Sequence, residues 1–142
     1  MANHMFDLEH VSGAMNEGWE VGKGPDGARA IWENLAECEA NNKLVEAHLS
    51  SAVNDDSVAA FLIGAGPLAL FGSGGWSFTG AAFDRWVPEY YDRPLGKALG
   101  PAMAITDPQS GNVTMVRKFT TGTVARFCVN TSTGDIAWSD EK

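Results

Sequence analysis

Two ionisable residues, Glu46 and His48, lie near the end of a short apolar run at residues 44–49. Apolar side chains occupy positions 45, 47 and 49, and this alternation is typical of a half-buried β-strand. A histidine beside a carboxylate can orient it or hold a substrate hydroxyl. Because α/β folds gather their chemistry at the carboxyl ends of strands, these two residues are the first candidates for a functional site.

Glu17 supplies a second carboxylate, in a predicted strand at residues 11–19. Glycoside hydrolysis requires two carboxyl groups, about 5–5.5 Å apart for retention and about 6.5–9.5 Å apart for inversion. Neighbouring strands run about 4.8 Å apart, so Glu17 and Glu46 are the best-placed pair. We take Glu17, Glu46 and His48 as candidate catalytic residues. An alternative stays open, in which Glu46 pairs with a cation and His48 is a satisfied polar residue.

Aromatic residues gather in a glycine- and proline-rich excursion at residues 72–110, and Trp76, Trp86 and Tyr90 are candidate substrate-binding residues. Aromatic rings on loops can stack on a ligand such as a sugar. They can equally fold back as a lid over the core, and both interpretations stay open. No cysteine and histidine cluster indicates a metal site, and the sequence indicates no cofactor.

The elements that position these residues are predicted from hydrophobic periodicity. An apolar stripe at helical spacing predicts a helix over 28–41, and Asp26 is expected to cap it. A second helix at 57–66, capped by Asn54 or Asp55, is apolar almost all round and is expected to be deeply buried or to form an interface. A third short strand follows at 68–71. Strands that alternate with helices predict parallel βα units over residues 11–71.

The last forty residues change to the period of strands. Runs at 113–119, 123–130 and 135–138 are rich in Val, Thr and Phe, and turn residues separate them. They predict an antiparallel three-strand meander over 111–139, with Ala125, Phe127 and Val129 on one side. The fold class is therefore α/β, within one domain spanning residues 1–142.

Composition excludes some classes of partner. The chain has 142 residues and a formal net charge of −8, and it contains no basic run, which argues against nucleic acid or an anionic membrane surface. We find no signal peptide and no apolar run of membrane-spanning length in the sequence, and nothing in it indicates a compartment.

Four segments are notable together: GAMNEGW (13–19), KLVEAH (43–48), WVPEYYDRPLGKALGPA (86–102) and RKFTTGTVARFCVNTSTGDIAW (117–138). Their order resembles the closing part of glycoside-hydrolase-like (β/α)8 barrel proteins. A full barrel needs eight strand–helix units and usually about 250 residues, whereas this chain contains two or three units. The resemblance therefore implies an incomplete barrel with open sheet edges, which need a protein partner or self-association.

Two functions follow as expectations. The first is a non-catalytic structural or interaction subunit, built on a truncated glycosidase-like scaffold and docking in a larger assembly. The alternative is a carbohydrate-active glycoside hydrolase, or a sugar-binding module, that uses paired carboxylates.

Overall fold

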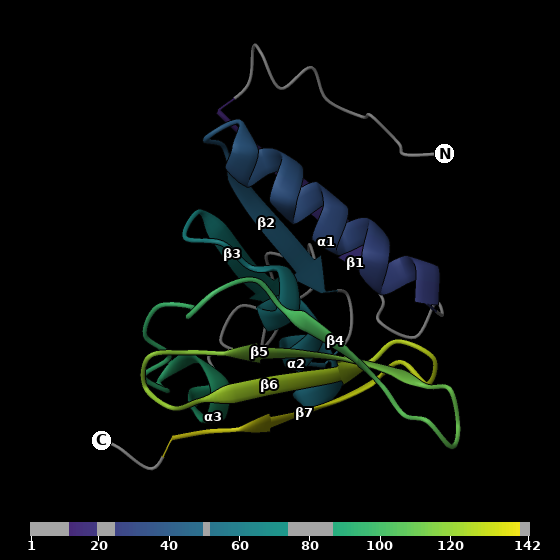
Figure 1. Cartoon of the computed structure of the whole chain (residues 1–142). Helices are drawn as coiled ribbons and strands as arrows, with labels where there is room; N and C mark the ends of the chain where they lie inside the picture. The colour runs from purple at the N-terminus through teal and green to yellow at the C-terminus, as the bar shows by residue number, and fades with distance from the viewer. Residues whose placement is uncertain (1–11, 20–24, 50–51, 74–86, 140–142) are drawn as a thin grey trace.

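A computed structural model describes residues 12–19, 25–49, 52–73 and 87–139 of the chain. These residues form two sheets with helices between them (Figure 1). The parallel sheet has the order β1-β2-β3, with strands at Gly13–Trp19, Leu44–Leu49 and Ala69–Ser73. The antiparallel sheet has the order β4-β5-β6-β7, with strands at Met103–Thr106, Val113–Lys118, Val124–Cys128 and Thr133–Ala137. The α/β fold class is confirmed, and the described strands form no closed barrel.

The predicted βα units are confirmed. Helix α1 (Pro25–Ala40) connects β1 to β2, and α2 (Asp55–Gly64) connects β2 to β3. Asp26 lies in the first turn of α1 and not at its cap, because the helix begins one residue earlier. The helix ends at Ala40, and two residues later Asn42 has a φ of 53°, the left-handed conformation that Asn tolerates.

Helix α2 begins with the predicted cap. The Asn54 side chain accepts a hydrogen bond from the Ser57 backbone N–H at 2.9 Å, and the Ser57 hydroxyl accepts one from the Asn54 N–H at 3.1 Å. This reciprocal pair satisfies backbone donors that the first helical turn leaves unbonded. All seven residues from 57 to 63 are buried, as the apolar sequence predicts.

Helix α2 is buried on every side because of its position in the fold. It contacts α1 on one side and β5, β6 and β7 on the other, so it forms part of the core of both sheets. Gly134 of β7 permits the close approach, because a Cβ there would lie only 2.6 Å from the Cβ of Ala59. The core extends from Val45 and Ala47 of the parallel sheet through the helices to Phe127 of the antiparallel sheet.

All three predicted strands of the meander are confirmed as β5, β6 and β7. Ala125, Phe127 and Val129 are buried on the side of α2, and the alternate residues of β6 face outward. One strand was not predicted: β4 pairs antiparallel with β5 and makes this a four-stranded sheet. The predicted irregular excursion at 72–110 thus ends in a strand, and it also contains the short helix α3 (Pro88–Tyr91).

None of the helices in the described part of the chain is long and apolar enough to cross a membrane. Both cysteines are free thiols; Cys38 is buried in α1, and Cys128 is half-buried in β6.

Candidate functional site

Strand β2 positions Glu46 and His48 on the face of the parallel sheet that points away from the helices. Val45, Ala47 and Leu49 alternate with them and are at most 1% exposed. In the register of the sheet, Met15 of β1 and Leu70 of β3 lie on either side of Glu46, and Gly72 lies beside His48. We call this surface, formed by Met15, Leu44, Glu46, His48, Leu70 and Gly72, the Glu46 face.

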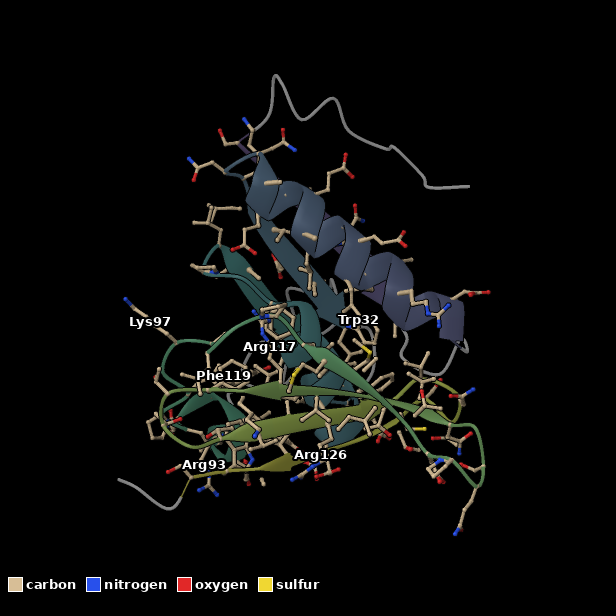
Figure 2. All side chains as sticks on the ribbon, viewed as in Figure 1. Trp32, Arg93, Lys97, Arg117, Phe119 and Arg126 are labelled. Carbon is tan, nitrogen blue, oxygen red and sulfur yellow. The ribbon has the colours of Figure 1, made fainter. Side chains whose placement is uncertain are left out.

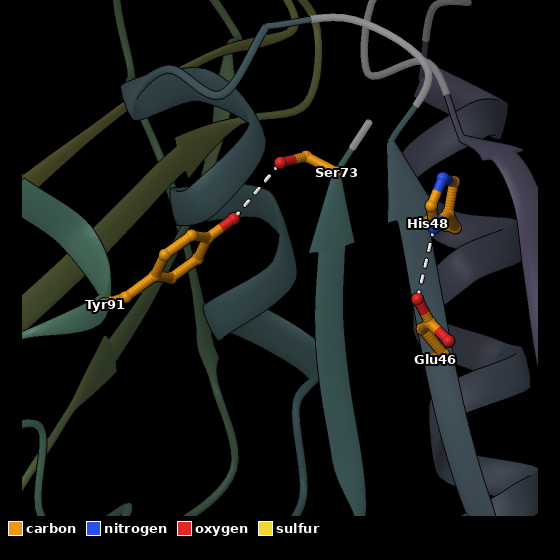
Figure 3. A network of polar contacts seen from close by, with 4 residues as sticks. All are labelled: Glu46, His48, Ser73 and Tyr91. Atoms are coloured by element: carbon orange, nitrogen blue, oxygen red, sulfur yellow. Dashed lines mark hydrogen bonds and ion pairs between the residues drawn. The ribbon is translucent and has the colours of Figure 1, made fainter. Parts of the chain in front are cut away.

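The two ionisable side chains contact each other. Nδ1 of His48 lies 3.1 Å from Oε1 of Glu46, and their side chains are 17% and 31% exposed (Figure 3). Gly72 makes room for the pair, since a Cβ at this position would collide with Oε1 of Glu46 and lie 3.2 Å from Nδ1 of His48. With Nδ1–H donating to the carboxylate, Glu46 fixes the tautomer and orientation of the imidazole.

A second polar contact lies at the carboxyl end of the neighbouring strand. The Ser73 hydroxyl, at the end of β3, is 3.3 Å from the Tyr91 hydroxyl (Figure 3). The Tyr91 ring packs 6.3 Å from the ring of Phe71 on the same strand. Ser73 and Tyr91 were not among the predicted site residues. The sequence could have indicated both residues, because Tyr91 adjoins the candidate Tyr90 and Ser73 follows the third predicted strand.

Tyr90 faces a different part of the molecule. Its hydroxyl donates to Oδ1 of Asp55 at 2.8 Å, and its ring lies 6.4 Å from that of Trp138. Burial, followed by the hydrogen bond to Asp55, raises the pKa of Tyr90 to about 12. Arg93 lies over the same Trp138 ring at 5.9 Å. These contacts hold α3 against the start of α2.

The remaining candidates are only partly described. Glu17 lies in β1, after the last regular pair Asn16–Ala47 and where the register with β2 shifts, but its side chain is outside the described residues. Trp76 and Trp86 also lie outside them. The predicted pairing of the Glu17 and Glu46 carboxylates therefore stays a prediction.

Comparison with known proteins gives no assignment for this arrangement: no family model matches the chain, and no curated protein matches it. The resemblance to glycoside-hydrolase-like barrels stays a prediction. Within the described residues, no three His, Cys, Asp or Glu side chains are grouped so that they could hold a metal ion.

The described geometry supports two kinds of chemistry at the Glu46 face. One is polar recognition, in which the oriented imidazole and the carboxylate bind a hydroxyl or a cation. The other is association, because the polar pair is surrounded by exposed apolar residues. Leu44 and Leu70 are 50% and 53% exposed, and Met15 is 36% exposed.

Proposed function

We propose that this chain is a non-catalytic interaction subunit that docks in a larger assembly through the Glu46 face. The observation that carries the proposal is the exposure of Met15, Leu44 and Leu70 on one face of a parallel sheet. Parallel sheets are ordinarily covered on both faces, and the described helices α1 and α2 lie on the opposite one. Contiguous exposed apolar side chains mark interaction sites.

Charge defines the kind of partner. Among the described residues, Glu46 contacts His48 but no lysine or arginine, and in the register of the sheet it lies between Met15 and Leu70. A partner that covers this face must therefore bring apolar side chains and a basic group for Glu46, because a buried carboxylate without a cation is costly. The net charge of −8 also favours a basic partner.

A site-specific photo-crosslinker tests this proposal in the cells that produce the protein. A photoreactive amino acid at Leu70 or Leu44 is expected to give one discrete adduct, whose mass and identity are read by mass spectrometry. The same amino acid at the exposed Gln109 is the control and should give no such adduct. Glu46→Lys in the Leu70 background should abolish the adduct. Absence of an adduct from both leucines, or an adduct that Glu46→Lys leaves unchanged, would contradict the proposal.

A second candidate is carbohydrate binding or hydrolysis, and the Glu46–His48 contact over Gly72 favours it. The protein would be tested with a panel of aryl-glycosides and by calorimetry with sugars. Activity that Glu17→Gln and Glu46→Gln each abolish would support a hydrolase. Binding that survives both substitutions would indicate a sugar-binding module instead. If the wild-type protein neither hydrolyses the aryl-glycosides nor binds the sugars, carbohydrate binding or hydrolysis is excluded for the sugars used.

A further inference from the structure

Strand β4 combines exposure with apolar character. All four of its residues are exposed, and Met103 and Ile105 are 58% and 54% exposed. Leu99, just before the strand, is 66% exposed. The strand lies at the edge of the antiparallel sheet, since its described partner is β5 alone. An exposed apolar edge of this kind is a template for pairing with another strand.

The hydrogen bonds around β4 show which of its backbone groups point outward. The Asp107 N–H donates to the Asn112 carbonyl at 2.8 Å, just beyond the strand. Because bonded and non-bonded pairs alternate in an antiparallel ladder, Ile105 and Met103 also direct their backbone groups to β5. Ala104 and Thr106 therefore direct their N–H and C=O groups away from the sheet.

A bond on the other side of β5 agrees with this assignment. Val113, which lies opposite Thr106, accepts from the Val129 N–H at 2.9 Å and so directs its carbonyl away from β4. The pair of Thr106 and Val113 is thus a non-bonded one, as the alternation requires.

The other edge strands carry features that discourage pairing, and β4 lacks them. Each of β1, β3 and β7 contains a glycine, at Gly13, Gly72 and Gly134 respectively. Strand β7 also carries Asp135, which pairs with Arg126 at 2.8 Å. The sequence of β4, MAIT, contains no glycine, proline or charge. Among these edges, β4 therefore fits strand addition best.

We infer that β4 pairs with β4 of a second copy of this chain, around a two-fold axis, and so joins two antiparallel sheets into one. A two-fold axis perpendicular to the sheet makes the two strands antiparallel and keeps corresponding faces on the same side. Residues directly opposite each other must then share a face. With Ala104 opposite Ala104 of the second copy, Met103 lies opposite Ile105 of the second copy, and all four apolar side chains share one face.

This register also uses the outward backbone groups. The two Ala104 residues exchange both N–H···O=C bonds, and Thr106 lies opposite Ala102 of the second copy. The segments that flank the strand carry opposite charges, Lys97 before it and Asp107 after it. Lys97 is exposed and lies on the side of β4 that precedes the strand (Figure 2), and antiparallel pairing brings that side next to the Asp107 turn of the second copy. A second copy therefore satisfies the backbone, the apolar side chains and the local charges together.

The molar mass in solution tests this inference. Light scattering coupled to size exclusion, at high micromolar concentration, should give twice the 15.1 kDa of one chain. Ala104→Pro removes the central outward N–H but no bond within the sheet, and it should weaken self-association about thirtyfold, because both reciprocal bonds are lost. Ile105→Lys should weaken it at least about tenfold by placing like charges at the apolar contact.

Leu70→Lys is the matched control, because Leu70 is as exposed as Ile105 but lies on the Glu46 face. It should leave the molar mass unchanged, whereas the photo-crosslinked adduct formed from Leu44 should be lost. The self-pairing of β4 and the proposed docking function can therefore be contradicted independently. Circular dichroism checks that each variant is folded. A wild-type protein of 15.1 kDa at every concentration overturns the inference, as does a dimer that Leu70→Lys disrupts and the two β4 variants do not.

Discussion

Removal of the Arg117 guanidinium should destabilise the fold more than removal of an ordinary arginine side chain on a sheet strand. Arg117 points from β5 to the end of α2, where Nη1 donates to the carbonyls of Leu62, Ile63 and Ala65 at 3.1, 3.2 and 2.6 Å (Figure 2). Its Nε donates to the Gly100 carbonyl at 3.2 Å. Helix α2 has no basic residue in its own last turn, so a cation from another element takes that role.

The expected loss of unfolding free energy follows from the number of hydrogen bonds that one nitrogen can donate. Nη1 carries two hydrogens, so we count two charge-assisted bonds to the three carbonyls, each contributing about 1.5 kcal/mol. Arg117→Met keeps the aliphatic part of the side chain and should lower the free energy of unfolding by about 3 kcal/mol, or the melting temperature by about 10 °C. Arg117→Lys keeps the charge but loses the planar donor group, and should cost about half as much.

Urea denaturation followed by circular dichroism measures both losses. Arg126→Met is the matched control, because Arg126 lies on the next strand and points to the opposite face, where its partner Asp135 is 63% exposed. An exposed ion pair contributes about 0.5 kcal/mol, so this variant should be nearly as stable as the wild type. A loss below about 1 kcal/mol for Arg117→Met, or a loss no larger than that of Arg126→Met, would refute this stabilising role of the Arg117 guanidinium.

Three further predictions concern the contacts around α2. Because the native pKa of Tyr90 is about 12 and the unfolded one 10, the unfolded state loses its proton first. Stability should therefore fall between pH 10 and 12 in urea titrations, and Tyr90→Phe should flatten this fall; an unchanged profile contradicts the assignment. Gly134→Ala should cost about 1–3 kcal/mol in thermal melts by pushing against Ala59, whereas Gly100→Ala, with nothing within 4 Å, should cost far less; equal costs would exclude the clash. Asn54→Ala should cost about 1 kcal/mol in the same melts and Asn54→Ser almost nothing, unless the cap contributes no stability.

The parallel units were predictable because local pattern and tertiary position agree there. The alternation of residues 44–49 reports directly which side chains face the helices, and the apolar run 57–66 reports a helix buried on every side. The left-handed conformation of Asn42 just after α1 and the cap at Asn54 are local signals as well. Each of these predictions depends on residues that lie within a few positions of one another.

The candidate site was harder to predict because its contacts join distant segments. Glu46 and His48 are two positions apart on one strand, so their contact could be expected from the sequence. The contact between Ser73 and Tyr91 joins residues 18 positions apart on different elements, and no periodicity encodes such a contact. For the same reason, the sequence identified the aromatic character of Tyr90 but not its bond to Asp55 at the start of α2.

The strand that the sequence did not predict, β4, is also the one to which we assign self-pairing, and both facts have one physical cause. Strand β4 covers no core, so its side chains need no alternation between buried and exposed positions, and all four residues are exposed. Its strand conformation comes instead from the backbone ladder with β5. A strand held by its backbone on one side presents the same kind of ladder on its other side. Apolar residues kept on such a strand are thus better explained by a second strand than by the core of their own chain.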